Sequence, residues 1–108
     1  MGRDGYLGEF EQMLLLAALR LGEEAYGAAI SQELEEAVGR RVSRGAIYVT
    51  LDRLEAKGLI ASRMSASRPE RGGRPRRMIA VTPAGVAALR ESRSALETLW
   101  NGVEALGG

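Results

Sequence analysis

The side chains of this protein best suited to chemistry are basic, and they gather in the middle of the chain. Between Arg40 and Arg77 there are eleven basic and three acidic residues, a net charge of +8, whereas residues 1–37 carry two basic and eight acidic residues, a net charge of −6. Fourteen of the fifteen basic residues are arginine, whose guanidinium group binds phosphates and guanine edges through paired hydrogen bonds. This asymmetry indicates a surface that faces a polyanion. The alternative is a solvated face that pairs with the acidic half of the chain.

The same inventory argues against catalysis. The chain has no cysteine and no histidine, which removes thiolate nucleophiles, zinc sites built on Cys and His, and the usual general base at neutral pH. No paired acids and no phosphate-binding glycine loop in front of a helix replace them. We therefore predict no enzymatic activity, no metal and no cofactor.

The first candidate contact surface is the stretch 70–77, Glu-Arg-Gly-Gly-Arg-Pro-Arg-Arg. Its glycines and proline predict the turn of a hairpin whose strands are expected over residues 59–67 and 76–82. Such a basic tip can grip flanking phosphates or the minor groove of DNA, the alternative being an exposed basic turn. Its candidate DNA-binding residues are Arg71, Arg74, Arg76 and Arg77.

The second candidate surface is a helix expected over residues 43–57, with Ser43 as N-cap. Apolar spacing buries one side of this helix, at Ile47, Leu51 and Leu54. On a helical wheel the other side presents Arg44, Gly45, Tyr48, Val49, Asp52, Arg53 and Ala56. Gly45 permits close approach of the backbone to DNA, and Arg53 can reach a phosphate or a guanine edge. We predict a recognition helix; the alternative is a set of ordinary solvated residues.

Hydrophobic periodicity predicts the scaffold that positions these surfaces. It indicates helices over residues 7–21, ended by Gly22, and 26–38, capped by Gly39. Residues expected to face inward are Ala29, Ile30, Leu34 and Val38 on the second helix, and Ile60, Met64, Ile79 and Val81 on the hairpin. Thr82 and Pro83 are typical of the N-cap and first residue of a last helix, which we expect to reach at least Leu106.

This order of elements predicts a mainly α (α+β) winged helix-turn-helix, with an N-terminal helix, a β-hairpin wing and a C-terminal dimerisation helix. The connection before Ser43 leaves room for a short strand at Val42. We assign residues 1–82 to the DNA-binding domain and residues 83–108 to the dimerisation helix of the same compact unit. A chain of 108 residues fits one domain with a small core.

The last helix carries more apolar surface than so small a domain can cover, so we expect a homodimer. The candidate dimerisation residues are Leu7, Phe10, Leu14, Leu89, Leu96, Leu99, Trp100 and Val103. Trp100 is also a candidate wall of a cavity for a small-molecule effector, against the alternative that it only packs. The apolar runs are too short to span a membrane, and acidic residues near the start do not fit a secretory signal. We expect a cytoplasmic protein, associated with the nucleoid when bound to DNA.

Three stretches, AYGAAISQEL, SRGAIYVTLDRLEAKGLI and RGGRPRRMIAVTPAG, resemble the PadR family of bacterial transcriptional regulators. The resemblance spans about residues 7–89 and implies a homodimeric winged-helix repressor. It places these residues on motif positions that face DNA: Tyr26, Ser43, Gly45, Tyr48, Arg53, Arg74 and Arg76. The chain departs from the family pattern at Val49, where proline is frequent, and at Met78 and Ile79, where aromatic residues are frequent.

Together these features lead us to expect a sequence-specific repressor that binds a pseudo-palindromic operator as a homodimer and is released by an effector. Two alternatives stay open. The same fold can serve as a protein-interaction module, or as a small-molecule sensor with a ligand cavity at the dimer interface.

Overall fold

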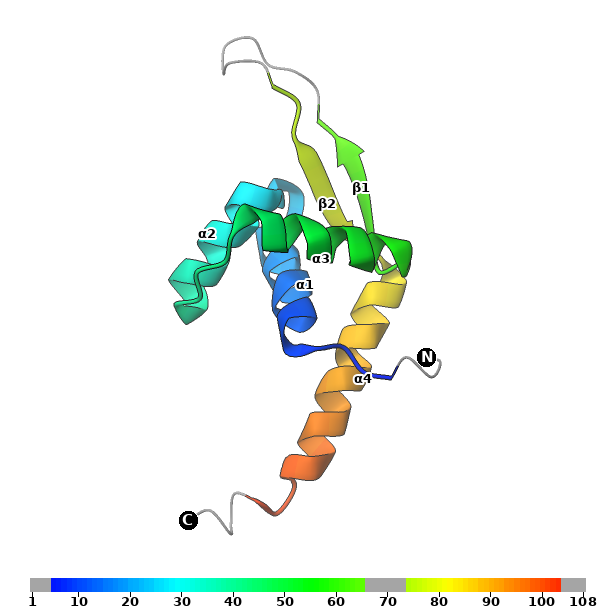
Figure 1. Ribbon diagram of the computed structural model, residues 1–108. Coiled ribbons are helices and arrows are strands. Elements are labelled where there is room, and N and C mark those ends of the chain that lie inside the picture. Colours follow the sequence, from blue (N-terminus) through cyan, green and yellow to red (C-terminus); the bar gives the residue numbers. More distant parts are fainter. Residues whose placement is uncertain (1–4, 66–73, 104–108) are drawn as a thin grey trace.

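The computed structural model describes residues 5–65 and 74–103 (Figure 1). Within these ranges the elements follow in the order α1 (Glu9–Leu21), the 3₁₀ turn η1 (Gly22–Glu24), α2 (Gly27–Val38), α3 (Arg44–Ala56), β1 (Ile60–Met64), β2 (Arg77–Val81) and α4 (Pro83–Trp100). The two strands pair antiparallel, with Ile60 opposite Val81 and Met64 opposite Arg77. The predicted winged helix-turn-helix is confirmed.

The predicted caps lie where the helices begin and end. The hydroxyl of Ser43 accepts a hydrogen bond from the Ala46 amide at 3.1 Å, and the hydroxyl of Thr82 accepts one from the Gly85 amide at 3.1 Å. Gly39 ends α2 in the left-handed conformation at φ 68°, which glycine adopts without steric cost. These local signals coincide with the boundaries of the helices.

Helix α1 is the centre of the core. It packs against α2, α3, α4 and β2, and its Leu14 and Leu15 are each 1% exposed. The predicted inward residues Ile30 and Leu34 on α2, the three predicted on α3, and Ile60 and Ile79 on the hairpin are buried with them. This small core holds α3 and the hairpin on one side of the molecule (Figure 1).

Two residues expected to face inward are exposed. Val38 is 57% exposed because it is the last residue of α2, beyond the surfaces that α1 and α3 cover. Met64 is 64% exposed because it lies at the end of β1, where the hairpin projects past the helices (Figure 1).

Two predicted elements also differ. Val42 forms no strand; instead Tyr26 makes an isolated bridge with Met78, and the Ile79 amide donates to the Ala25 carbonyl at 2.8 Å. The segment before α2, and not the one before α3, therefore lies along the edge of the hairpin. Helix α4 ends at Trp100, because Asn101 turns to an extended ψ of 118° and Gly102 has φ 87°. The predicted helix end at Leu106 lies outside the described residues.

Helix α4 joins the rest of the fold through Gly85. A Cβ atom on Gly85 would lie 2.2 Å from the Leu59 carbonyl oxygen, so only glycine allows this approach. The Thr82 amide donates to that same carbonyl at 3.0 Å. Beyond Ser92, which is buried, α4 extends away from the other helices (Figure 1).

Candidate nucleic-acid interface

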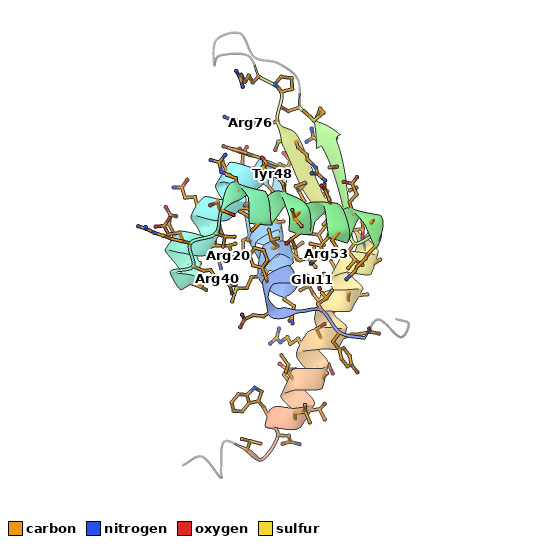
Figure 2. The ribbon with its side chains drawn as sticks, viewed as in Figure 1. Glu11, Arg20, Arg40, Tyr48, Arg53 and Arg76 are labelled. Carbon is orange, nitrogen blue, oxygen red and sulfur yellow. The ribbon has the colours of Figure 1, made fainter. Side chains whose placement is uncertain are left out.

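The outward side of α3 forms the centre of the candidate interface. Residues predicted to lie on this side are all exposed: Arg44, Gly45, Tyr48, Val49, Asp52, Arg53 and Ala56. Val49, a β-branched apolar residue, is 59% exposed. Figure 2 shows Tyr48 and Arg53 on this helix and Arg76 on the hairpin. The helix thus offers cationic, apolar and small residues side by side, the combination that reads base edges and approaches phosphates.

The N-terminal half of α3 is held against α2 through Tyr48 and Gly27. A Cβ atom on Gly27 would lie 2.6 Å from the Tyr48 hydroxyl oxygen, so the absence of a side chain at Gly27 makes room for this ring. Sequence reasoning did not assign Gly27 a role. The available signal was a glycine inside the first turn of a helix, where it needs a packing reason.

Tyr26 and Arg76, predicted separately as DNA-binding residues, lie together at the outer end of the paired strands. The guanidinium carbon of Arg76 lies 4.3 Å from the centre of the Tyr26 ring. The Arg76 backbone also pairs with Ser65, whose amide donates to the Arg76 carbonyl at 2.7 Å. A cation–π contact of this kind contributes about 0.5–1 kcal/mol at an exposed site, and it directs the Arg76 side chain toward the start of α2.

Arg77, also predicted to bind DNA, is bound to two carboxylates of α3. Its guanidinium donates to Asp52 Oδ1 at 2.9 Å and to Glu55 Oε1 at 2.7 Å, and its side chain is only 24% exposed. Burial lowers the pKa of Arg77, but the hydrogen bonds that it donates to Glu55 and Asp52 outweigh burial and raise it overall. The Arg77 hydrogen-bonding groups are thus directed to carboxylates of α3, and a contact of Arg77 with DNA stays a prediction.

Three further residues were predicted to contact DNA: Arg71, Arg74 and Ser43. Arg74 is exposed where the described part of the hairpin resumes, and Arg71 lies outside the described residues. The Ser43 hydroxyl accepts the capping hydrogen bond of α3, which leaves its own proton as a donor.

Three of the predicted dimerisation residues belong to the core of the single chain. Leu7, Leu14 and Leu89 are buried within it, and the Leu7 amide donates to the Ser92 hydroxyl at 2.9 Å. Their apolar surface is therefore already covered within one chain, and a role for these three in a dimer stays a prediction. Phe10 is partly buried beneath the Arg40 guanidinium. The other four stay exposed: Leu96, Leu99, Trp100 and Val103.

Helix α1 adds two exposed leucines that the predicted set of dimerisation residues omits. Leu16 and Leu19 are 49% and 44% exposed. The available signal was apolar area around most of this helix, which exceeds what a single contact can bury.

Two hollows bear on ligand binding. Trp100 lines a shallow, mostly polar one with Ser94, Glu97, Thr98, Asn101 and Gly102. A more enclosed and largely apolar cavity of about 360 Å³ lies between the end of α1 and the hairpin, with Leu19, Met78 and Ala80 in its wall. In the part of the chain that the structure describes, no helix is long and apolar enough to cross a membrane, and no cluster of acidic side chains could hold a metal ion.

The sequence of this chain is similar to those of known proteins. Residues 15–91 match the transcriptional regulator PadR-like family. The transcriptional regulator Rv3488 of Mycobacterium tuberculosis is 49% identical over 85 residues, which are 79% of this chain and 73% of that protein.

Solved structures show the same fold. A PadR-like transcription factor from Bacteroides fragilis has a TM-score of 0.72 at 28% identity and covers 90% of this chain and 88% of its own. A PadR family transcriptional regulator from Eggerthella lenta has a TM-score of 0.65 at 30% identity, with 88% and 83% covered.

Proposed function

Because this chain belongs to the PadR-like family of transcriptional regulators, we propose that it acts by binding double-stranded DNA in a sequence-specific manner. Membership confirms the prediction of a regulator and not an enzyme. The observation that carries the proposal is the outward side of α3, where Arg44, Val49 and Arg53 are exposed beside the hairpin. Such a helix enters the major groove while the wing contacts flanking phosphates or the minor groove.

The working form in this proposal is a homodimer on a pseudo-palindromic operator. Exposed apolar residues on two helices support it: Leu16 and Leu19 on α1, and Leu96, Leu99, Trp100 and Val103 at and beyond the end of α4. Monomeric proteins rarely leave large apolar patches open to water. A two-fold dimer places two copies of α3 in successive major grooves about 34 Å apart, and its presence over a promoter represses transcription.

An effector would release this repressor by favouring a dimer geometry with a different spacing of the two α3 helices. Trp100 supports this part of the proposal, because it is exposed in a hollow next to the apolar residues of α4. It is the sole tryptophan of the chain, so quenching of its fluorescence by an added aromatic compound tests whether it lines a ligand site. An unchanged spectrum with every compound leaves Trp100 as a packing residue.

The DNA proposal is tested by fluorescence anisotropy at about 0.15 M salt, where long-range charge effects are screened. Binding to a duplex from upstream of the protein's own gene is compared with binding to a shuffled duplex. We expect Arg53→Ala and Arg44→Ala each to weaken the specific complex about tenfold, as loss of a base or phosphate contact does. Arg90→Ala is the matched control, because it removes an exposed arginine from α4.

Weak and equal binding of both duplexes by the unaltered protein would contradict the proposal. If duplexes selected from a randomised pool also gave no preference, the result would favour the protein-interaction module.

A further inference from the structure

A cluster of charged side chains joins the hairpin to the outward side of α3. We infer that Arg77 is a positioning residue: it holds the wing at a fixed angle to α3 and offsets part of the negative charge of two carboxylates there, and so sets DNA selectivity without touching DNA. This inference rests on the proposed DNA binding and names a residue that controls it.

The geometry of the cluster ties both strands to one helix. Arg77 on β2 uses two different nitrogens to hold Asp52 and Glu55, which are three residues apart on α3 and therefore neighbours on its surface. From β1, the Ser62 hydroxyl donates to the same Glu55 oxygen at 2.8 Å. A rigid planar guanidinium that spans two acceptors restricts the direction of the strand as well as its distance.

A second set of contacts holds β2, along the edge that does not pair with β1, to the start of α2. The Ile79 amide donates to the Ala25 carbonyl, and Arg76 stacks over the Tyr26 ring. The base of the wing is thus attached to α2 and to α3, the two helices of the helix-turn-helix. Removing Arg77 leaves the attachment to α2 and the hydrogen bond from Ser62 to Glu55, and it removes the hydrogen bonds that hold β2 to α3.

The cluster also sets the charge of the candidate interface. Asp52 is exposed on the same side of α3 as Val49 and Arg53, where an uncompensated carboxylate would repel phosphates. The hydrogen bonds from Ser62 and then Arg77 hold the pKa of Glu55 below its ordinary value, so Glu55 remains a carboxylate to which Arg77 binds. Exposed ion pairs contribute little to global stability, which points to orientation and charge as the role of this one.

The test uses two kinds of variant that break the cluster. A control variant loses one positive charge elsewhere on the hairpin. Arg77→Gln removes the guanidinium, whereas the double variant Asp52→Asn/Glu55→Gln removes both acceptors and leaves Arg77 in place. Arg63→Gln is the control: Arg63 is exposed on β1 opposite Met78, on the other face of the hairpin from Arg77, so this variant loses one positive charge with the cluster intact. For each protein, anisotropy gives the ratio of affinities for a selected duplex and a shuffled one.

We expect Arg77→Gln and Asp52→Asn/Glu55→Gln each to lower this selectivity ratio about fivefold or more, and the triple variant to be no worse than Arg77→Gln, because all three break one interaction. Arg63→Gln weakens both duplexes by similar factors and leaves the ratio unchanged. If Arg77 contacted DNA directly, Arg77→Gln would lower the selectivity ratio, whereas Asp52→Asn/Glu55→Gln would keep or raise it. That result would overturn the inference.

Amide hydrogen exchange of the strands gives a readout that does not depend on DNA. Circular dichroism first establishes which variants fold; if Arg77→Gln does not, the double variant carries the test. Amides of β1 and β2 should exchange faster in the cluster variants than in Arg63→Gln. Equal protection in all variants would overturn the inference even if the unaltered protein bound DNA, whereas a missing DNA preference with lost protection would contradict only the proposed function.

Discussion

At the scale of single residues, two glycines illustrate how context decides a role. Gly27 lies under the Tyr48 ring, which a Cβ atom would displace, whereas a Cβ atom on Gly45 would meet only the Ser43 hydroxyl at 4.0 Å. Gly27 is therefore explained by packing within the chain. Gly45 is not, because alanine would fit there and would favour the helix. Its missing side chain is explained if the backbone of α3 approaches DNA closely.

Gly45→Ala should separate stability from binding. We expect the melting temperature to stay the same or rise, with a gain of up to about 1 kcal/mol from helix propensity, while affinity for the specific duplex falls severalfold because the new methyl group holds the backbone away from DNA. Thermal unfolding by circular dichroism and anisotropy measure the two effects. Unchanged affinity would show that the backbone at Gly45 does not lie against the duplex.

At the scale of elements, charged side chains connect helix ends that are distant in sequence. Glu11 in the first turn of α1 accepts a hydrogen bond from the Gly8 amide at 3.0 Å and binds Lys57, just after α3, at 3.0 Å. Burial raises the pKa of Glu11, but the hydrogen bonds with Gly8 and Lys57 outweigh burial and lower it overall. The start of α1 is thereby held to the end of α3.

This lowered pKa predicts a pH dependence of stability. A carboxyl whose pKa is lower in the folded than in the unfolded state stabilises the fold above its unfolded pKa, near 4.3, and loses that contribution as the pH falls through its folded pKa. Glu11→Gln should be less stable by about 1 kcal/mol at pH 7, and the difference should shrink as the pH falls below the unfolded pKa.

The matched control for Glu11→Gln is Glu9→Gln. Glu9 lies in the same first turn of α1 as Glu11 and forms an exposed ion pair with Arg40. Denaturant unfolding at several pH values should show only a small change for that variant. A Glu11→Gln difference that stayed constant down to pH 3 would indicate that packing, and not the charge, is what Glu11 contributes.

At the scale of the whole molecule, the apolar residues left exposed on α1 and on α4 are the main unexplained surface. Leu99 is 72% exposed, and the proposed dimer gives it and Trp100 a partner. Leu99→Glu places a charge in that interface and should shift the protein toward monomer. Light scattering after size-exclusion chromatography measures this change from twice 11.6 kDa to 11.6 kDa. DNA affinity should fall with it, since each protomer then binds a half-site alone.

Ala87→Glu is the control for this experiment, because Ala87 is exposed on the part of α4 that lies beside the core. It adds the same charge outside the proposed interface and should leave the mass unchanged. An unaltered protein that elutes as a monomer at micromolar concentration would contradict the dimer.

What the sequence determined by itself are the features that depend on near neighbours. Ser43 and Thr82 cap their helices and Gly39 ends one, because these effects act within three or four residues. Periodicity likewise identified the buried side of α3 and hence its outward side. The fold class and the central candidate surface could be predicted for this reason.

Only the tertiary structure decided which side chains are available at those surfaces. Arg76 and Arg77 are adjacent in sequence, yet one stacks on Tyr26 and the other binds Asp52 and Glu55. Leu14 and Leu16 lie on the same helix, yet one is core and the other exposed. Each outcome depends on how the hairpin, α3 and α4 pack around α1, which brings together residues more than twenty positions apart. A local sequence pattern shows whether a side chain is charged or apolar. Which residue that side chain contacts depends on the packing of elements that are distant in the chain.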